Sequence, residues 1–97
     1  MDYRITTSTI CFNNLEELKA TIASVDKQNV KPFEHLVIDG STNNEIKDYL
    51  ENSEQPNYRR WICEPDEGIS DAFNKGVYHA KGDIVHLLNS GDYYYDE

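Results

Sequence analysis

The sequence has little positive charge and no long apolar segment, and both absences exclude common classes of protein. It carries 9 Lys and Arg against 18 Asp and Glu, which gives a net charge of −9. Nucleic-acid binding needs clustered Lys and Arg, so we expect no nucleic-acid partner. No run approaches the roughly 18 apolar residues that span a membrane, and residues 1–4 do not resemble a signal peptide. We therefore expect a cytoplasmic protein, which as a full-length chain could lie peripherally at the inner face of the membrane.

The residue patterns for nucleophilic catalysis, zinc binding and a phosphate-binding loop are also missing. Cysteine occurs only as Cys11 and Cys63, without ligand spacing, so we expect two reduced, buried thiols rather than a zinc site. The three histidines are scattered, and there is no GxSxG motif. No glycine-rich loop follows the first predicted strand. A diphosphate bound to this acidic chain would therefore need a divalent cation.

Alternating strand and helix patterns run through the 97 residues. Leu18, Ile22 and Val25 share one helical face, and Asn14 with Glu17 has the spacing of a capping box. The apolar runs of the second and fourth strands suit buried positions. The predicted strands are 3–12, 33–39, 59–63 and 83–88, and the predicted helices are 14–28, 44–52 and 69–80. The order βαβαβαβ predicts an α/β, Rossmann-like fold, which is a parallel sheet with helices on both faces.

Polar residues follow the carboxyl end of every predicted strand. They occupy 9–13, 39–41, 64–66 and 89–92, and three of these four ends carry carboxylates. Parallel sheets bind their ligands at this edge, and hard divalent cations prefer carboxylate oxygens. Each of these residues taken alone could be a turn or cap residue, but acids at three ends of one sheet favour a ligand-binding edge.

Four segments of the sequence, in order and at matching spacing, resemble those of one enzyme family. They are TICFNN (9–14), VIDGST (37–42), EPDEGISDAFNKG (64–76) and AKGDIVHLLNSGD (80–92). Together they resemble the inverting, nucleotide-sugar-dependent glycosyltransferases of family 2, which have the GT-A fold. The resemblance implies a partial GT-A fold with strand order 3-2-1-4. Residues 1–97 would then be the N-terminal nucleotide-sugar-binding part of a domain truncated before its acceptor half.

The resemblance also implies roles for individual residues. Thr9 and Phe12 would line the pocket for the nucleotide base, and Asp39 would accept a hydrogen bond from the base, which suits the imide N–H of uracil. Asp92, the acidic end of a DXD-like motif, would bind Mg²⁺ or Mn²⁺. The implied nucleotide-binding residues are Thr9, Phe12, Asn13, Asp39, Ser41, Asp66, Asp71, Asn89 and Ser90.

By the same resemblance, the full-length protein would transfer a sugar from a UDP-sugar, or another nucleotide sugar, to an acceptor hydroxyl. The acceptor would be a saccharide or a lipid-linked molecule, as in bacterial polysaccharide biosynthesis. The metal would stabilise the departing nucleotide. The catalytic base would lie downstream of Glu97, so the present region would hold no catalytic residue and would be inactive alone.

The sequence departs from the family pattern at two positions, and one alternative function is open. Gly91 stands where many family members carry Asp, and Glu67 stands where a basic residue is common. The alternative is a free-standing nucleotide-binding or protein-interaction module on the same scaffold.

A sheet that stops after its fourth strand would also leave an exposed edge, which predicts a homodimer.

Overall fold

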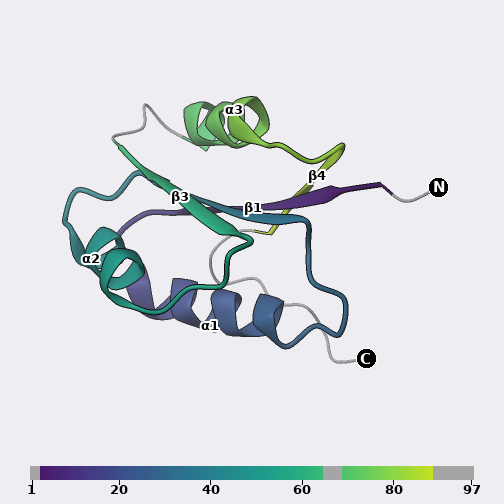
Figure 1. Cartoon of the computed structure of the whole chain (residues 1–97). Helices are drawn as coiled ribbons and strands as arrows, with labels where there is room; N and C mark the ends of the chain where they lie inside the picture. Colours follow the sequence, from purple (N-terminus) through teal and green to yellow (C-terminus); the bar gives the residue numbers. More distant parts are fainter. Residues whose placement is uncertain (1–2, 65–68, 89–97) are drawn as a thin grey trace.

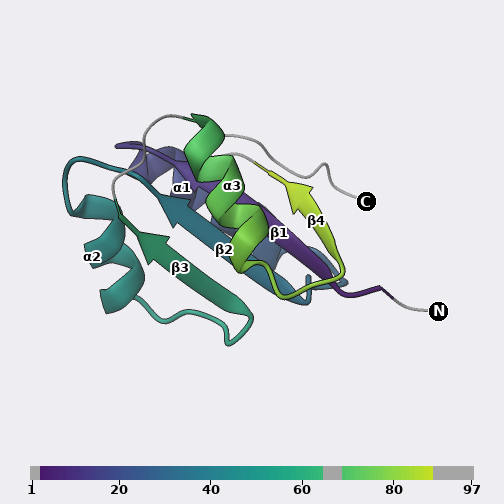
Figure 2. The ribbon, with the colours of Figure 1, turned by 90° about the horizontal axis from the view of Figure 1, so that it is seen from above.

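The computed structural model of the chain describes residues 3–64 and 69–88 (Figure 1). Its strands are β1 (Ile5–Cys11), β2 (Glu34–Asp39), β3 (Arg59–Cys63) and β4 (Ile84–Leu87), and its helices are α1 (Leu15–Asp26), α2 (Glu45–Asn52) and α3 (Ile69–His79). The strands form one parallel sheet in the order β3-β2-β1-β4. Helices α1 and α2 cover one face, and α3 covers the other (Figure 1, Figure 2). The predicted α/β fold, strand order and layers are confirmed.

Strand β2 lies at the centre of the sheet and contributes to two hydrophobic cores. All six of its residues are buried, between β1 and β3. Val37 belongs to the core under α1 and α2, together with Leu18. Leu36 and Ile38 belong to the core under α3, together with Ala72. Because successive residues of a strand point to opposite faces, one short apolar run can stabilise both layers.

Helix α1 keeps the predicted apolar face but not the predicted cap. Leu18, Ile22 and Val25 are buried. The Asn14 side chain makes no capping hydrogen bond, and its Oδ1 instead accepts one from the Phe12 N–H at 2.9 Å. The capping-box prediction is therefore wrong, because this amide closes the turn that precedes the helix. Within the described residues, no helix has both the length and the apolar character needed to cross a membrane.

Strand β4 is exposed, although its apolar sequence predicts a buried strand. Ile84, Val85 and Leu87 are 44%, 36% and 38% exposed. Within the described residues β4 pairs only with β1 and forms one edge of the sheet. The prediction of burial is wrong for this strand, because an edge strand has a neighbour on one side only and its side chains are left open to solvent.

Helix α3 approaches β1 closely at Gly76. A Cβ atom at position 76 would lie 2.5 Å from Ser8 Oγ and 3.5 Å from Ser8 Cβ. Glycine at this position therefore allows the helix to pack this closely against the sheet. Ser8 is 2% exposed, and among the described residues its hydroxyl has no hydrogen-bond partner.

Cys11 and Cys63 lie on either side of Asp39 in the sheet. The register pairs Cys11 with Asp39 on β2, and Asp39 with Cys63 on β3. A whole strand therefore separates the two thiols, which is too far for a disulfide, and both are free. Cys11 is buried as predicted. Cys63 is only half-buried, because β3 is an edge strand, so the prediction of its full burial is wrong.

Candidate functional site

The loops that follow β1 and β2 are joined at the carboxyl edge of the sheet. Asn13 Nδ2 donates to Thr42 Oγ1 at 3.0 Å, and the Thr42 N–H donates to Asn13 Oδ1 at 3.1 Å. The Asn13 N–H also donates to Ser41 Oγ at 2.8 Å. The Gly40 N–H donates to the Cys11 carbonyl at 3.1 Å, which continues the strand pairing into the loops. Two turns that are distant in the sequence thus form one connected surface.

The turn at Asn13 presents an aromatic ring at this edge. Asn13 has a φ of 52°, in the left-handed region that Asn adopts more readily than most residues. Its neighbour Phe12 is 57% exposed. An aromatic side chain that is open to solvent beside polar groups can stack on the flat face of a nucleotide base.

Asp39 ends β2 and is almost completely buried at this edge. It is 3% exposed, and its Oδ1 accepts hydrogen bonds from the Ser41 N–H at 3.0 Å and from the Ser41 hydroxyl. Burial, together with the charge of Asp39 and a hydrogen bond to it, raises the pKa of the Cys63 thiol to about 12. Asp39 therefore orders the loop after β2 and keeps the neighbouring thiol protonated.

A second set of polar contacts joins the end of β3 to α3. Lys75 Nζ lies 3.2 Å from Glu64 Oε1 and 3.5 Å from Asp71 Oδ2, and the Lys75 side chain is 15% exposed. Glu64 directly follows β3, so these ion pairs tie α3 to the strand ends. Sequence reasoning missed Lys75 and Thr42 as site residues. The i,i+4 spacing of Asp71 and Lys75 was an available signal, whereas Thr42 has none that a single sequence shows.

The structure brings together only part of the predicted nucleotide site. Asn13, Asp39 and Ser41 are joined by hydrogen bonds, and Phe12 lies next to them in the chain. Asp71 lies on α3 and forms an ion pair with Lys75 of the same helix. The other predicted site residues, Asp66, Asn89, Ser90 and the predicted metal ligand Asp92, lie outside the described residues, as do Glu67 and Gly91.

The carboxylates at this edge are already engaged by protein groups. In residues 3–64 and 69–88, no group of three or more His, Cys, Asp or Glu side chains is placed to hold a metal ion. Asp39 accepts from Ser41, and Glu64 and Asp71 both pair with Lys75. A cation bound here would therefore depend on a further ligand, for which the sequence suggests Asp92.

Hollow volume alone does not identify the site. A hollow of about 350 Å³ lies beside the joined loops and is lined by residues 13–17 and Glu45. A larger one, of about 720 Å³, lies at the opposite end of the sheet between Tyr3, Phe33 and Ile84, among others. The larger hollow is mostly apolar, and none of its lining residues is Asp or Glu. We assign the candidate site to the carboxyl edge, because parallel sheets bind ligands there and the joined polar loops carry the exposed Phe12 ring.

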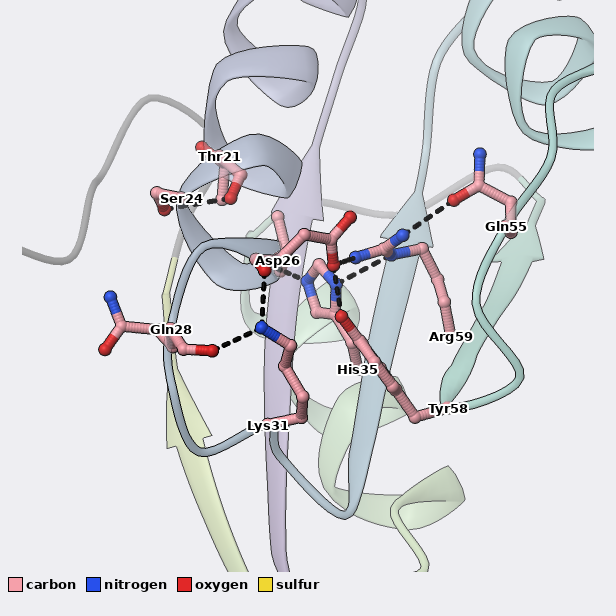
Figure 3. Close-up of polar contacts among 10 residues, drawn as sticks. Thr21, Ser24, Asp26, Gln28, Lys31, His35, Gln55, Tyr58 and Arg59 are labelled. Carbon is pink, nitrogen blue, oxygen red and sulfur yellow. Dashed lines mark hydrogen bonds and ion pairs between the residues drawn. The ribbon is translucent and has the colours of Figure 1, made fainter.

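A buried polar network occupies the amino end of the sheet on the α1 side (Figure 3). The Arg59 side chain is fully buried, and its Nη2 lies 2.6 Å from Asp26 Oδ1. Arg59 Nη1 donates to Gln55 Oε1 at 2.7 Å, and Arg59 Nε donates to His35 Nδ1 at 2.9 Å. The Tyr58 hydroxyl donates to the same Asp26 oxygen. The network joins the end of α1 to the starts of β2 and β3.

His35 and Thr9 complete this network and are not available to a ligand. Burial, with a further contribution from the Arg59 charge, lowers the pKa of His35 to about 3, so the ring is neutral. Its Nδ1 accepts from Arg59, so the proton is on Nε2, which lies 2.9 Å from Thr9 Oγ1. Thr9 is fully buried. The predicted role of Thr9 in a base pocket therefore disagrees with its position, since its side chain faces the core.

A second buried network lies at the same end on the α3 side. Glu34 is 4% exposed, and its Oε1 accepts from Thr6 Oγ1 at 2.8 Å and from the Lys81 N–H at 2.9 Å. Arg60 Nε lies 2.6 Å from Glu34 Oε2, and the Gly82 N–H donates to Thr6 Oγ1 at 2.9 Å. Burial alone raises the pKa of Glu34, but the hydrogen bonds from Lys81 and Arg60 outweigh it and hold the pKa below its usual value.

Comparisons with known proteins agree with the fold and with the family resemblance. The family model described as glycosyl transferase family 2 matches residues 8–97. Two curated relatives from two strains of Mycobacterium tuberculosis, each named an uncharacterized glycosyltransferase, are 42% identical over 85 residues. The match covers 87% of this chain and 32% of each relative, so the chain spans about a third of their length.

A solved structure shares the whole described architecture. It is the mannosyltransferase PcManGT from Pyrobaculum calidifontis, in complex with GDP-Man and Mn²⁺, with a TM-score of 0.81 and 20% identity. The superposition covers 99% of this chain and 30% of the mannosyltransferase. At this level of identity the likeness establishes the fold.

Proposed function

Since the chain belongs to glycosyl transferase family 2, we propose that it is the N-terminal, donor-binding part of a glycosyltransferase domain. The observation that carries the proposal is the carboxyl edge, where Asn13, Ser41 and Thr42 join two loops beside the exposed ring of Phe12. Ligands of parallel α/β sheets bind at this edge. At the amino end, Arg59 and Glu34 are buried and paired with other side chains, so they are not open to a ligand.

The proposed donor is a nucleotide sugar. The family resemblance favours a UDP-sugar, whereas the mannosyltransferase with the same fold was solved with GDP-Man. In the structure Asp39 is buried and bonded to Ser41, so it contributes to base recognition mainly by holding the loop in place. The proposed acceptor is a hydroxyl of a saccharide or of a lipid-linked molecule. The base that would deprotonate it belongs to a later part of the full-length protein.

The proposed cofactor is Mg²⁺ or Mn²⁺, with Asp92 as its ligand. Such a cation would neutralise the diphosphate of the donor and stabilise the departing nucleotide. The described carboxylates supply no complete cation site. What the described residues do supply is the orientation of the two loops and the exclusion of water beneath them, where Asp39 and Cys11 are buried.

Calorimetric titration of the chain with UDP and with GDP, each with and without Mn²⁺, tests the proposal. We expect metal-dependent binding of one nucleotide. Phe12→Ala is expected to weaken it about tenfold, since stacking of a base on an aromatic ring contributes roughly 1–3 kcal/mol. Asp92→Ala is expected to abolish the dependence on metal. Phe33→Ala is the matched control, because Phe33 is 46% exposed at the opposite end of the sheet. A folded chain that binds neither nucleotide would refute the proposal.

We also propose that the chain forms a weak homodimer through β4. Its apolar side chains are exposed, and β4 is an edge of the described sheet. The opposite edge, β3, carries the partly exposed Arg60 side chain, and charged edges resist pairing. The hollow beside β4 is lined by no acidic residue, so two copies can meet there without bringing their excess of carboxylates together. Size-exclusion chromatography with light scattering is expected to show a dimer that Val85→Lys abolishes; a monomer at high concentration would contradict it.

A further inference from the structure

The joined loops at the carboxyl edge contain bonds that neither loop makes by itself. Three hydrogen bonds run from Asn13 to the loop after β2, and we call them the Asn13–Thr42 clasp. Asn13 Nδ2 donates to Thr42 Oγ1, the Thr42 N–H donates to Asn13 Oδ1, and the Asn13 N–H donates to Ser41 Oγ. A backbone N–H can only donate, so the Thr42 N–H fixes which end of the amide is the oxygen. Both ends of the Asn13 side chain are therefore used within the protein.

The clasp holds a backbone conformation that most residues avoid. Asn13 has a φ of 52°, and among the described residues other than glycine it is the only one with a positive φ. Such conformations persist where surrounding contacts determine them, and they concentrate at functional sites. Here the surrounding contacts are the clasp and the bond from the Phe12 N–H to Asn14 Oδ1 at 2.9 Å. Together the clasp and this bond fix the direction in which the Phe12 side chain projects from the backbone.

The clasp is continuous with the buried carboxylate of Asp39. The Ser41 hydroxyl has one hydrogen, which it donates to Asp39 Oδ1, and it accepts the Asn13 N–H through a lone pair. A chain of hydrogen bonds thus runs from Asp39 through Ser41 to the turn that carries Phe12. The exposed ring and the loop after β2 are fixed relative to each other before any ligand arrives.

We propose that Asn13 and Thr42 are positioning residues for the nucleotide, and that neither contacts it through its side chain. The clasp preforms the surface on which the base stacks, so binding does not have to order two separate loops. This inference rests on the proposed donor site and deepens it. It also revises the predicted role of Asn13, whose amide nitrogen and amide oxygen each bond to Thr42. Both residues are exposed, so the clasp can be broken without unfolding the core.

Three substitutions separate positioning from folding. Thr42→Val keeps the branched side chain and the N–H but removes the oxygen that accepts from Asn13. Thr42→Ser restores that oxygen. Asn13→Gly removes the amide while leaving a positive φ accessible. As a matched control, Ser24→Ala removes a hydroxyl that donates to the Thr21 carbonyl at 2.9 Å on α1, away from the loops (Figure 3).

The experiment is calorimetric titration of each variant with the nucleotide that the wild type binds in the presence of Mn²⁺, alongside urea unfolding. We expect Thr42→Val and Asn13→Gly to weaken binding about 5- to 10-fold, which corresponds to roughly 1–1.4 kcal/mol, with near wild-type unfolding midpoints. Thr42→Ser and Ser24→Ala are expected to bind as the wild type does. This pattern, with rescue by serine, supports positioning.

Two other outcomes would overturn the inference in distinguishable ways. If the wild type binds nucleotide and both clasp variants bind it equally well, the positioning role is wrong and the proposed function stands. If the folded wild type binds neither UDP nor GDP, the proposed function fails and the positioning role fails with it. If Thr42→Val is unfolded, Asn13→Gly decides between these outcomes, because glycine tolerates the backbone conformation of the turn.

Discussion

The two ends of the sheet both carry polar side chains, but they differ in burial. At the amino end the Arg59 side chain is 0% exposed and Glu34 is 4% exposed, and each makes several hydrogen bonds to neighbouring elements. At the carboxyl end Asn13 and Thr42 are exposed, and the ring of Phe12 is open to solvent. The two polar networks of the amino end are thus centred on buried side chains, whereas at the carboxyl end Asp39 is buried but the Asn13–Thr42 clasp and the Phe12 ring lie on the surface.

This difference in burial separates residues whose loss should reduce the stability of the fold from residues whose loss should reduce ligand affinity. A buried charge must be paired, so removing one partner leaves the other desolvated and unfolds part of the molecule. An exposed amide or hydroxyl can bond to water instead, so its loss costs little stability. We therefore expect substitutions at the amino end to act on unfolding, and substitutions at the carboxyl end to act on ligand affinity.

Arg59→Met is expected to cause the largest loss of stability. Methionine fills much of the space but leaves Asp26 and His35 without the hydrogen bonds of Arg59. Breaking a buried ion pair costs roughly 3–5 kcal/mol, and since the Asp26 side chain is 38% exposed we expect the lower end, about 3 kcal/mol. Urea unfolding measures it. Lys19→Met, which breaks an exposed ion pair with Glu16, is the control and should change little.

Stability is expected to fall as the pH is lowered below about 6.5. Burial lowers the pKa of His35 from 6.5 in the unfolded chain to about 3 in the folded one. Between these values the unfolded chain binds more protons, so stability is fully present above the unfolded pKa and decreases on acidification, by up to about 1.4 kcal/mol per pH unit. Unfolding free energies at pH 7.0, 6.0 and 5.0 are a suitable test, with about 1.4 kcal/mol per unit as the upper bound.

His35→Gln is the control for this pH dependence. Glutamine can bond in the same place but does not titrate, so the slope between pH 6.5 and about 4.5 should be lost. Asp26 and Glu34 also have lowered pKa values in the folded chain, and their contributions to stability are lost only at lower pH. An unchanged slope in His35→Gln would mean that the amino-end network is not held by a neutral imidazole.

The same substitution at the two ends gives the most direct comparison. Thr6 is fully buried, and Thr6→Val removes an acceptor of the Gly82 N–H and a donor to Glu34. We expect a loss of about 2 kcal/mol in urea unfolding, because buried groups are left unsatisfied. Thr42→Val, at the exposed end, is expected to cost less than about 1 kcal/mol. Equal losses of unfolding free energy in Thr6→Val and Thr42→Val would contradict the proposed difference between the two ends of the sheet.

A small effect is expected midway between the ends, where α3 meets β1. Gly76→Ala places a methyl group 2.5 Å from Ser8 Oγ and should cost about 1–2 kcal/mol. Adding Ser8→Ala should recover most of that loss, because the remaining contact, to the Cβ of residue 8, is an ordinary 3.5 Å. Ser8→Ala alone should be neutral or slightly stabilising, since the buried hydroxyl lacks a partner among the described residues. A double-variant unfolding cycle measures all three.

The strands and their order could be predicted from the sequence because periodicity and apolar runs determine them. The bounds of β3 match the prediction residue for residue, and the burial of β2 follows from Leu36, Val37 and Ile38. The exposure of β4 could not be predicted from its own residues. A strand's burial depends on what covers it, and an apolar run has the same sequence whether or not a covering element is present.

The candidate site was predictable only in outline. Of the polar residues that follow the strands, Asn13, Asp39 and Ser41 do meet at the carboxyl edge, and ligand binding there stays a prediction. Thr9 was misplaced, because nothing in one sequence tells whether a threonine near a strand end faces the core. Thr42 was missed, since a hydrogen bond between loops 29 positions apart leaves no periodic signal. Asp66, Asn89, Ser90 and Asp92 lie outside the described residues and stay predictions.

The placement of Cys63 against Asp39 makes that thiol a chemical reporter of the carboxyl edge. Alkylating reagents attack the thiolate, and a pKa of about 12 leaves almost none of it at neutral pH. Labelling should therefore be slow in the folded chain. Burial is the largest cause of the raised pKa and Asp39 adds to it, so any rearrangement that exposes the sulfur or draws the Asp39 carboxylate away should speed iodoacetamide labelling.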